Sequence, residues 1–95
     1  MDRYVSAVTA FDLANKVRTG KLEAARDIIE RFDDFIAQGC FAKLDVTHSH
    51  ALLAGQMLRV HKDPFDRLLA AQARTEELAL ITVDQAFDQF GITRL

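Results

Sequence analysis

The sequence is poor in residues that cross-link or break a polypeptide chain. It has one cysteine, one proline, four glycines and no tryptophan in 95 residues. A lone Cys40 cannot form an intramolecular disulfide, and no cysteine–histidine spacing is typical of zinc, which excludes a disulfide-rich domain and a structural zinc site and fits a reducing compartment. The scarcity of proline and glycine excludes collagen-like and linker-dominated chains. A chain of this length predicts one domain covering residues 1–95.

Long apolar runs and an excess of positive charge are also missing. No stretch approaches the roughly 20 apolar residues that span a bilayer, and Met1–Ser6 lacks the basic flank and apolar core of a signal peptide. We therefore expect a cytoplasmic protein with no membrane partner. Twelve Lys and Arg against fourteen Asp and Glu give a net charge of −2, which excludes binding of nucleic acid by bulk positive potential. Any contact with nucleic acid must be local.

What is present is an alternation of strand-like and helix-like segments, read from apolar periodicity and capping residues. In the first half we expect a strand at Tyr4–Val8, a helix from Ala10 to about Arg18 capped by Thr9, a single amphipathic helix at Leu22–Ala37 ended by Gly39, and a strand at Phe41–Val46. In the second half we expect a helix from the cap Thr47 to about Val60, a helix from Pro64 to about Thr75 capped by Asp63, a buried strand at Leu78–Val83, a short helix around 85–90, and a possible last strand at Ile92–Leu95.

Strands that alternate with helices predict an α/β fold with a mostly parallel sheet, whose functional sites lie at the carboxyl ends of the strands. The positions expected to face the core of the last two long helices are Ala51, Leu52, Ala54 and Leu58, then Phe65, Leu68, Leu69 and Ala73. His50 is expected to pack or to cap its helix, and Cys40 to pack at the entry to a strand.

Three carboxylates are candidates for chemistry because of their placement. Asp12 lies near the middle of a helix that follows a strand, Asp66 lies in the first turn of a helix, and Asp84 directly follows a buried strand. Convergent carboxylates can hold Mg²⁺ or Mn²⁺, which orients water for attack on a phosphodiester. Each also has a structural explanation: Asp66 favours the helix dipole, Asp84 can cap the next helix, and Asp12 can simply be solvated.

Two long segments resemble the PIN-domain ribonucleases of the VapC toxin type. The segment from His61 to Ala73 followed by Leu80–Phe87 is similar to the C-terminal signature of that family, and Ser6–Leu22 is similar to its strand–helix segment. The resemblance therefore covers almost the whole chain. It implies a three-layer PIN-like α/β fold with a mostly parallel sheet.

The resemblance also implies the site and its partners. It implies metal-ligand positions at Asp12, Asp66 and Asp84, a supporting position at Thr82, and a capping role for Asp63. We expect Mg²⁺ or Mn²⁺ as cofactor, RNA as substrate, and a cognate antitoxin that inserts a peptide into the acidic groove. The candidates for contact with RNA phosphate are Arg67, Lys16 and Arg18.

The chain departs from the family pattern in two ways. The family usually has Glu where this chain has Asp12, which is one methylene shorter. Family members also begin with a central strand that delivers another Asp, and this sequence starts after that strand, as if truncated at the N-terminus. Three alternatives follow: the strands at Tyr4–Val8 and Leu78–Val83 pair directly, another chain fills the gap, or the start lies further upstream. Because an uncovered apolar edge favours association, we expect a homo-oligomer or a bound partner.

Two functions are compatible with these observations. One is a metal-dependent endoribonuclease of the VapC type. The other is a catalytically impaired PIN scaffold that binds an antitoxin or serves in an assembly, which the missing acid would favour.

Overall fold

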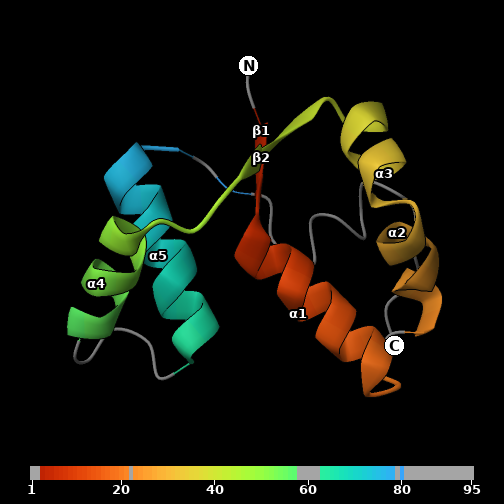
Figure 1. Ribbon diagram of the computed structural model, residues 1–95, viewed down its shortest axis with the longest axis horizontal. Helices are drawn as coiled ribbons and strands as arrows, with labels where there is room; N and C mark the ends of the chain where they lie inside the picture. The colour runs from red at the N-terminus through yellow and green to blue at the C-terminus, as the bar shows by residue number, and fades with distance from the viewer. Residues whose placement is uncertain (1–2, 22, 58–62, 79, 81–95) are drawn as a thin grey trace.

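The computed structural model describes residues 3–21, 23–57, 63–78 and 80 of the chain (Figure 1). Within these ranges it has two strands, six helical segments and a bridge at Leu80. The elements are β1 (Arg3–Ser6), α1 (Ala7–Arg18), the 3₁₀ segment η1 (Glu23–Ala25), α2 (Arg26–Glu30), α3 (Phe32–Gln38), β2 (Phe41–Leu44), α4 (His48–Gln56) and α5 (Pro64–Glu76).

The two strands are parallel, as the alternation of strands and helices predicts. β1 pairs with β2 in a register that places Arg3 opposite Phe41 and Ser6 opposite Leu44. On the other side of β1, Tyr4 forms a parallel bridge with Leu80. Leu80 lies in the segment expected as a buried strand, and at this one residue it is bridged directly to β1.

Helices lie on both sides of the strands, which confirms the predicted three-layer α/β arrangement. Helices α2 and α3 occupy one side and α4 and α5 the other, with α1 running below the strands between them (Figure 1). A hydrophobic cluster joins β1, β2 and α1 to η1, α2 and α3. Its buried members are Val5, Leu13, Val17, Ala25, Ile28, Phe35 and Phe41.

Helix α1 begins three residues earlier than expected, and its cap is Ser6 rather than Thr9. The Ser6 hydroxyl accepts a hydrogen bond from the backbone N–H of Val8 at 3.0 Å, which satisfies one of the free donors at the start of the helix. Thr9 is buried inside the first turn. The prediction was wrong because Ser6 and Thr9 are both good capping residues, and the strand stops after its fourth residue.

The single helix predicted at Leu22–Ala37 is three shorter segments. The chain leaves helical geometry at Arg31, whose φ is −121° and ψ 41°, and neither α2 nor α3 begins with a side-chain cap. The break lets the Phe35 ring pack against Phe41 on β2, with ring centroids 5.4 Å apart. Ile28 and Phe35 lie on the apolar face of the expected helix and are buried, but apolar spacing does not encode whether a helix is continuous.

The caps predicted for α4 and α5 are confirmed. Thr47 accepts a hydrogen bond from the N–H of His50, and the His50 ring accepts one from the N–H of Thr47, which makes a reciprocal capping box. Asp63 accepts from the N–H of Phe65, and Pro64 occupies the first helical position. Both helices therefore begin at the residues that the sequence indicates.

The buried faces of these helices were predicted less well. On α4, Ala54 is buried as expected, but Ala51 is exposed, Leu52 is 66% exposed, and the predicted core position Leu58 lies outside the described residues. On α5, the predicted positions are half-buried, whereas Ala71 and Gln72 are fully buried. These predicted half-buried positions are Phe65, Leu68, Leu69 and Ala73.

Cys40 is exposed and has a φ of 55°, so the prediction that it packs at the strand entry was wrong. It lies in the turn between Gly39 and β2, where its left-handed backbone directs the side chain away from the core. Among the described residues, no helix is both long and apolar enough to cross a membrane.

Candidate functional site

Asp66 lies in the first turn of α5, where the sequence placed it. Its side chain is exposed, and the preceding cap Asp63 bonds to the backbone, which confirms the capping role expected for that residue. The free N–H groups and the dipole at this end of α5 favour a negative charge. The carboxylate of Asp66 therefore lies at the surface, where a cation can reach it.

Asp12 lies in the middle of α1 and is paired with a lysine. Its carboxylate is 3.2 Å from the Lys16 ammonium one turn later, and its side chain keeps 25% of its exposure. Lys16, expected to contact RNA phosphate, thus has an intramolecular partner. Arg18, the second expected phosphate contact, donates a hydrogen bond to Asn15 at 2.7 Å.

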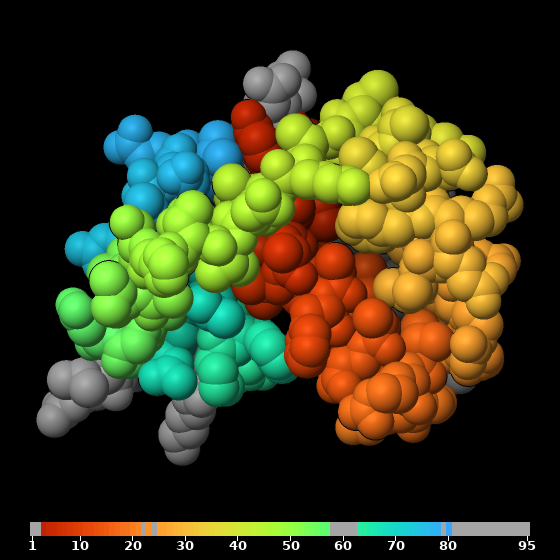
Figure 2. All heavy atoms as spheres, in the orientation of Figure 1, coloured from red at the N-terminus to blue at the C-terminus, as the bar shows by residue number. Residues whose placement is uncertain are grey.

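An aromatic contact joins the two helices that carry these carboxylates. The rings of Phe11 and Phe65 lie with their centroids 5.2 Å apart. The Ser6 hydroxyl before α1 meets Gln72 on the later part of α5. Because position 6 meets position 72 while position 11 meets position 65, the helices run in opposite directions, as Figure 1 shows. In the space-filling view α1 is flanked by α5 on one side and by α2 and α3 on the other (Figure 2).

Arg67 follows Asp66 on α5 and has unused hydrogen-bonding capacity. Its Nε atom is buried and, in the described part of the chain, has no hydrogen-bond partner. Buried polar nitrogen atoms almost always have one. Of the three cationic side chains expected to contact phosphate, Arg67 is thus the one with an unused donor next to a candidate metal ligand.

The third carboxylate, Asp84, and the supporting Thr82 lie outside the described residues. Within residues 3–21, 23–57, 63–78 and 80, no cluster of three or more histidine, cysteine, aspartate or glutamate side chains is arranged to hold a metal ion. The described part of the candidate site therefore consists of Asp12, Asp66 and the contacts that fix their helices.

A buried polar network, which the sequence did not predict, lies at the carboxyl ends of β1 and β2. Gln72 on α5 is fully buried and accepts a hydrogen bond from the Ser6 hydroxyl at 2.5 Å. Its amide nitrogen lies 3.1 Å from the carbonyl oxygen of Asp45, just after β2, and 3.3 Å from Nδ1 of His50 on α4. One side chain thus contacts three separate segments of the fold.

The donors and acceptors of this network are consistent with one another. Nδ1 of His50 accepts from the N–H of Thr47, so it carries no hydrogen, and the Gln72 amide nitrogen at 3.3 Å shares its single lone pair. The other ring nitrogen, Nε2, faces the carboxylate of Glu76 at 3.7 Å. The signal that could have revealed this network is Gln72 itself, a polar residue on the apolar face of its helix, four residues after Leu68.

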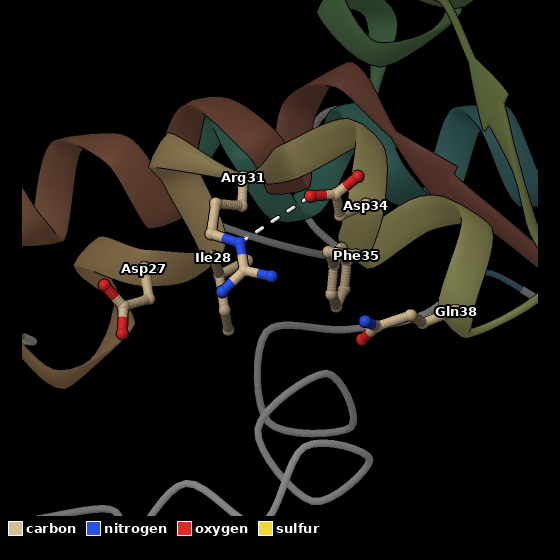
Figure 3. A pocket seen from close by; sticks show the side chains of 6 residues that line it. All are labelled: Asp27, Ile28, Arg31, Asp34, Phe35 and Gln38. Carbon is tan, nitrogen blue, oxygen red and sulfur yellow. Dashed lines mark ion pairs between the residues drawn. The ribbon is translucent and has the colours of Figure 1, made fainter.

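Two cavities lie away from the candidate carboxylates. A cavity of about 140 Å³ lies at the carboxyl ends of the strands. It is lined by Val5, Ser6, Ala7, Ala10, Phe32, Lys43, Leu44 and Asp45. A second, of about 170 Å³, lies between α2 and α3, where Asp27, Gln38 and the ion pair of Arg31 with Asp34 surround Ile28 and Phe35 (Figure 3).

Two side chains with shifted pKa values lie away from the candidate carboxylates. The pKa of the Glu23 carboxyl is lowered because it accepts hydrogen bonds from Arg26, and the same bonds raise the pKa of Arg26. Both residues belong to η1 and α2, whereas the candidate carboxylates belong to α1 and α5. These shifts reflect an exposed ion pair and say nothing of catalysis.

Comparison with known proteins gives one family. The family model described as PIN domain matches residues 2–92 of the chain. No curated protein and no solved structure matches the chain significantly.

Proposed function

The chain belongs to the PIN domain family, and on this premise we propose that it is a metal-dependent endoribonuclease of the VapC toxin type. Membership of this family indicates a nuclease-type function and, in general, dependence on a divalent metal ion. The proposal goes further in naming RNA as substrate, Mg²⁺ or Mn²⁺ as cofactor, and the carboxylates that bind it. The observation that carries it is the contact between the helices of Asp12 and Asp66.

The geometry of this contact supports a shared site. Phe11 and Phe65 face each other, and each carboxylate follows its phenylalanine by one residue. One residue along an α-helix is a rotation of about 100°. When two facing helices run antiparallel, equal rotations along each chain turn both side chains toward the same side of the pair. We therefore expect Asp12 and Asp66 to project from one side of the α1–α5 pair.

Two carboxylates suit the metal that the family implies. Mg²⁺ is commonly held by one or two protein carboxylates and keeps several water molecules. Asp12 and Asp66 would be protein ligands, and Asp84 would add a third. When bound, the ion would activate water against an RNA phosphodiester and offset the negative charge that develops on phosphate.

The cations around this pair have separate tasks in the proposal. Because its Nε is buried, Arg67 would contact a phosphate beside Asp66 through the terminal nitrogens of its guanidinium, a group that binds phosphate oxygens strongly. Lys16 forms an ion pair with Asp12. On metal binding Asp12 would exchange this ammonium for the metal, and Lys16 would be released to contact phosphate. Arg18 would contact the RNA backbone further along α1. The proposal also includes a cognate antitoxin, which would cover the acidic side of α1 and α5. It further includes self-association of the chain and a cytoplasmic location.

The proposal is tested by titrating the protein with Mn²⁺ and measuring cleavage of single-stranded RNA. We expect binding in the millimolar range or tighter, and loss of cleavage in Asp66→Asn and Asp84→Asn while both variants stay folded. The matched control is Asp63→Asn, because asparagine caps a helix as well as aspartate does, so this variant removes an equal charge three residues from Asp66 at little cost in stability.

Two results would contradict the nuclease. Cleavage that survives in both Asp66→Asn and Asp84→Asn would assign the activity to another site or to a contaminant. A folded wild type that binds no Mn²⁺ at millimolar concentration would instead favour the catalytically impaired scaffold that binds an antitoxin.

A further inference from the structure

We propose that Gln72 is a positioning residue for the metal site, which fixes α5 against the start of α1 and so sets the separation of Asp12 and Asp66. This inference rests on the proposed function. It concerns a residue that need not touch metal or RNA, and its evidence is the buried network at the carboxyl ends of β1 and β2.

Gln72 holds the two ligand-bearing helices to each other. It lies six residues after Asp66 on α5, and its partner Ser6 lies six residues before Asp12 and caps α1. The Ser6 hydroxyl gives its hydrogen to Gln72 and accepts the N–H of Val8, so the same oxygen starts α1 and ties it to α5. The cap and the tie cannot move independently.

The second half of the Gln72 amide ties α5 to the sheet edge. Its nitrogen lies within hydrogen-bond distance of the Asp45 carbonyl and of His50, so α5 is fixed to the chain after β2 and to α4. No other polar side chain on the described part of α5 is fully buried. An apolar residue at position 72 could fill the same volume but could not fix where α5 lies against β2 and α4.

Two points of contact define how antiparallel helices lie. The Phe11–Phe65 rings make one contact beside the carboxylates, and Ser6–Gln72 makes the other further along α5. Seven residues separate Phe65 from Gln72, which corresponds to about 10 Å along the helix axis. Without the Ser6–Gln72 hydrogen bond, α5 could pivot about the Phe11–Phe65 contact. The distance between the carboxylates of Asp12 and Asp66 would then no longer be fixed.

The test compares a variant that loses the hydrogen bonds of Gln72 with a variant that is destabilised elsewhere in the core. Gln72→Met keeps the volume and removes the hydrogen bonds. We expect it to weaken Mn²⁺ binding and to lower kcat by about 10- to 100-fold, the usual loss when a residue that orients metal ligands is changed, with little change in KM for RNA. The control is Phe35→Leu, which perturbs the core at α3, compared at a temperature where both variants are folded.

The second pair of variants keeps the test decisive if Gln72→Met does not fold. Ser6→Ala removes the hydroxyl and should reproduce the loss of Mn²⁺ affinity. Ser6→Thr retains the hydroxyl and the cap and should restore it, because Ser6 lines the 140 Å³ cavity that can accept a methyl group. In the double variant Ser6→Ala/Gln72→Met the losses should not add, since both remove the same hydrogen bond.

The outcomes distinguish this inference from the function on which it rests. Wild-type affinity for Mn²⁺ in folded Gln72→Met, or equal losses in Gln72→Met and Phe35→Leu, would overturn the positioning role and leave the nuclease intact. Absence of Mn²⁺ binding in the wild type would overturn both. Weaker binding in Gln72→Met and Ser6→Ala, with Ser6→Thr and Phe35→Leu near wild type, would support the inference.

Discussion

The ring of Phe11 packs against that of Phe65 at a tilt of 45°, and each ring immediately precedes a candidate metal ligand. Phe11 remains 55% exposed, so its contribution to the hydrophobic core is small. The Phe11–Phe65 contact thus joins α1 to α5 beside both carboxylates while adding little to the buried core.

Truncation of this ring should therefore affect the metal more than the fold. For Phe11→Ala we expect a loss of about 0.5–1.5 kcal/mol in the free energy of unfolding, the range of one aromatic pair. Affinity for Mn²⁺ should fall by about tenfold, since the ring fixes residues next to the ligands. Urea unfolding and Mn²⁺ titration measure the two effects. Leu52→Ala, a truncation at a 66% exposed position on α4, is the control and should change neither.

Wild-type affinity for Mn²⁺ in Phe11→Ala would show that the ring pair does not position the site. A loss of the same size in Leu52→Ala would point to a general effect of apolar truncation.

Two glycines should respond to alanine in opposite directions. A Cβ at Gly39 would overlap the Phe41 ring, which cannot easily withdraw because it packs on Phe35 and lies under the Arg3 guanidinium. Gly39→Ala should cost about 1–3 kcal/mol, as overpacking usually does. A Cβ at Gly55 meets nothing within 4 Å, and this residue is helical. Gly55→Ala should gain about 0.5–1 kcal/mol.

Urea unfolding at fixed pH measures both glycine variants. Stabilisation in Gly39→Ala would show that a Cβ at position 39 does not collide with the Phe41 ring. Destabilisation in Gly55→Ala would mean that α4 does not continue through that position.

The ion pair between Lys16 and Asp12 should compete with a metal for the carboxylate. Exposed pairs of this kind are worth about 0.2–1 kcal/mol, so Lys16→Gln should raise Mn²⁺ affinity by up to about fivefold at low salt. The gain should shrink as added salt screens the pair. The control is Arg18→Gln. It removes the same charge from the same helix, but the Arg18 side chain bonds to Asn15 rather than to Asp12.

Equal gains in Lys16→Gln and Arg18→Gln would assign the effect to net charge rather than to competition for Asp12. Unchanged affinity in Lys16→Gln would place Asp12 outside the metal site.

Features that depend on neighbouring residues were predictable from the sequence. Local hydrogen bonding and apolar periodicity account for three such features. They are the caps Thr47 and Asp63, the first-turn position of Asp66, and the alternation of helices with parallel strands. These signals act within one or two turns of the chain. For the same reason the sequence could place Asp12 and Asp66 on their helices.

Features that depend on distant residues were not predictable. The break at Arg31 serves the contact of Phe35 with Phe41, and the burial of Gln72 serves contacts with segments up to 66 residues away. The choice of Ser6 over Thr9 as cap also involves Gln72, which bonds to the same hydroxyl. Periodicity correctly gave the burial of Ala54 but not the exposure of Leu52, and the partner of each side chain depended on how the whole chain packs.

The hydrogen bond between Ser6 and Gln72 joins residues that are 66 positions apart. A polypeptide emerging from the ribosome makes β1 and α1 long before it makes the second half of α5, so the tie can close only late in synthesis. If the separation of the carboxylates depends on that tie, an unfinished chain lacks an ordered metal site. Under the proposed function, a nascent chain could not act as a nuclease until α5 has docked.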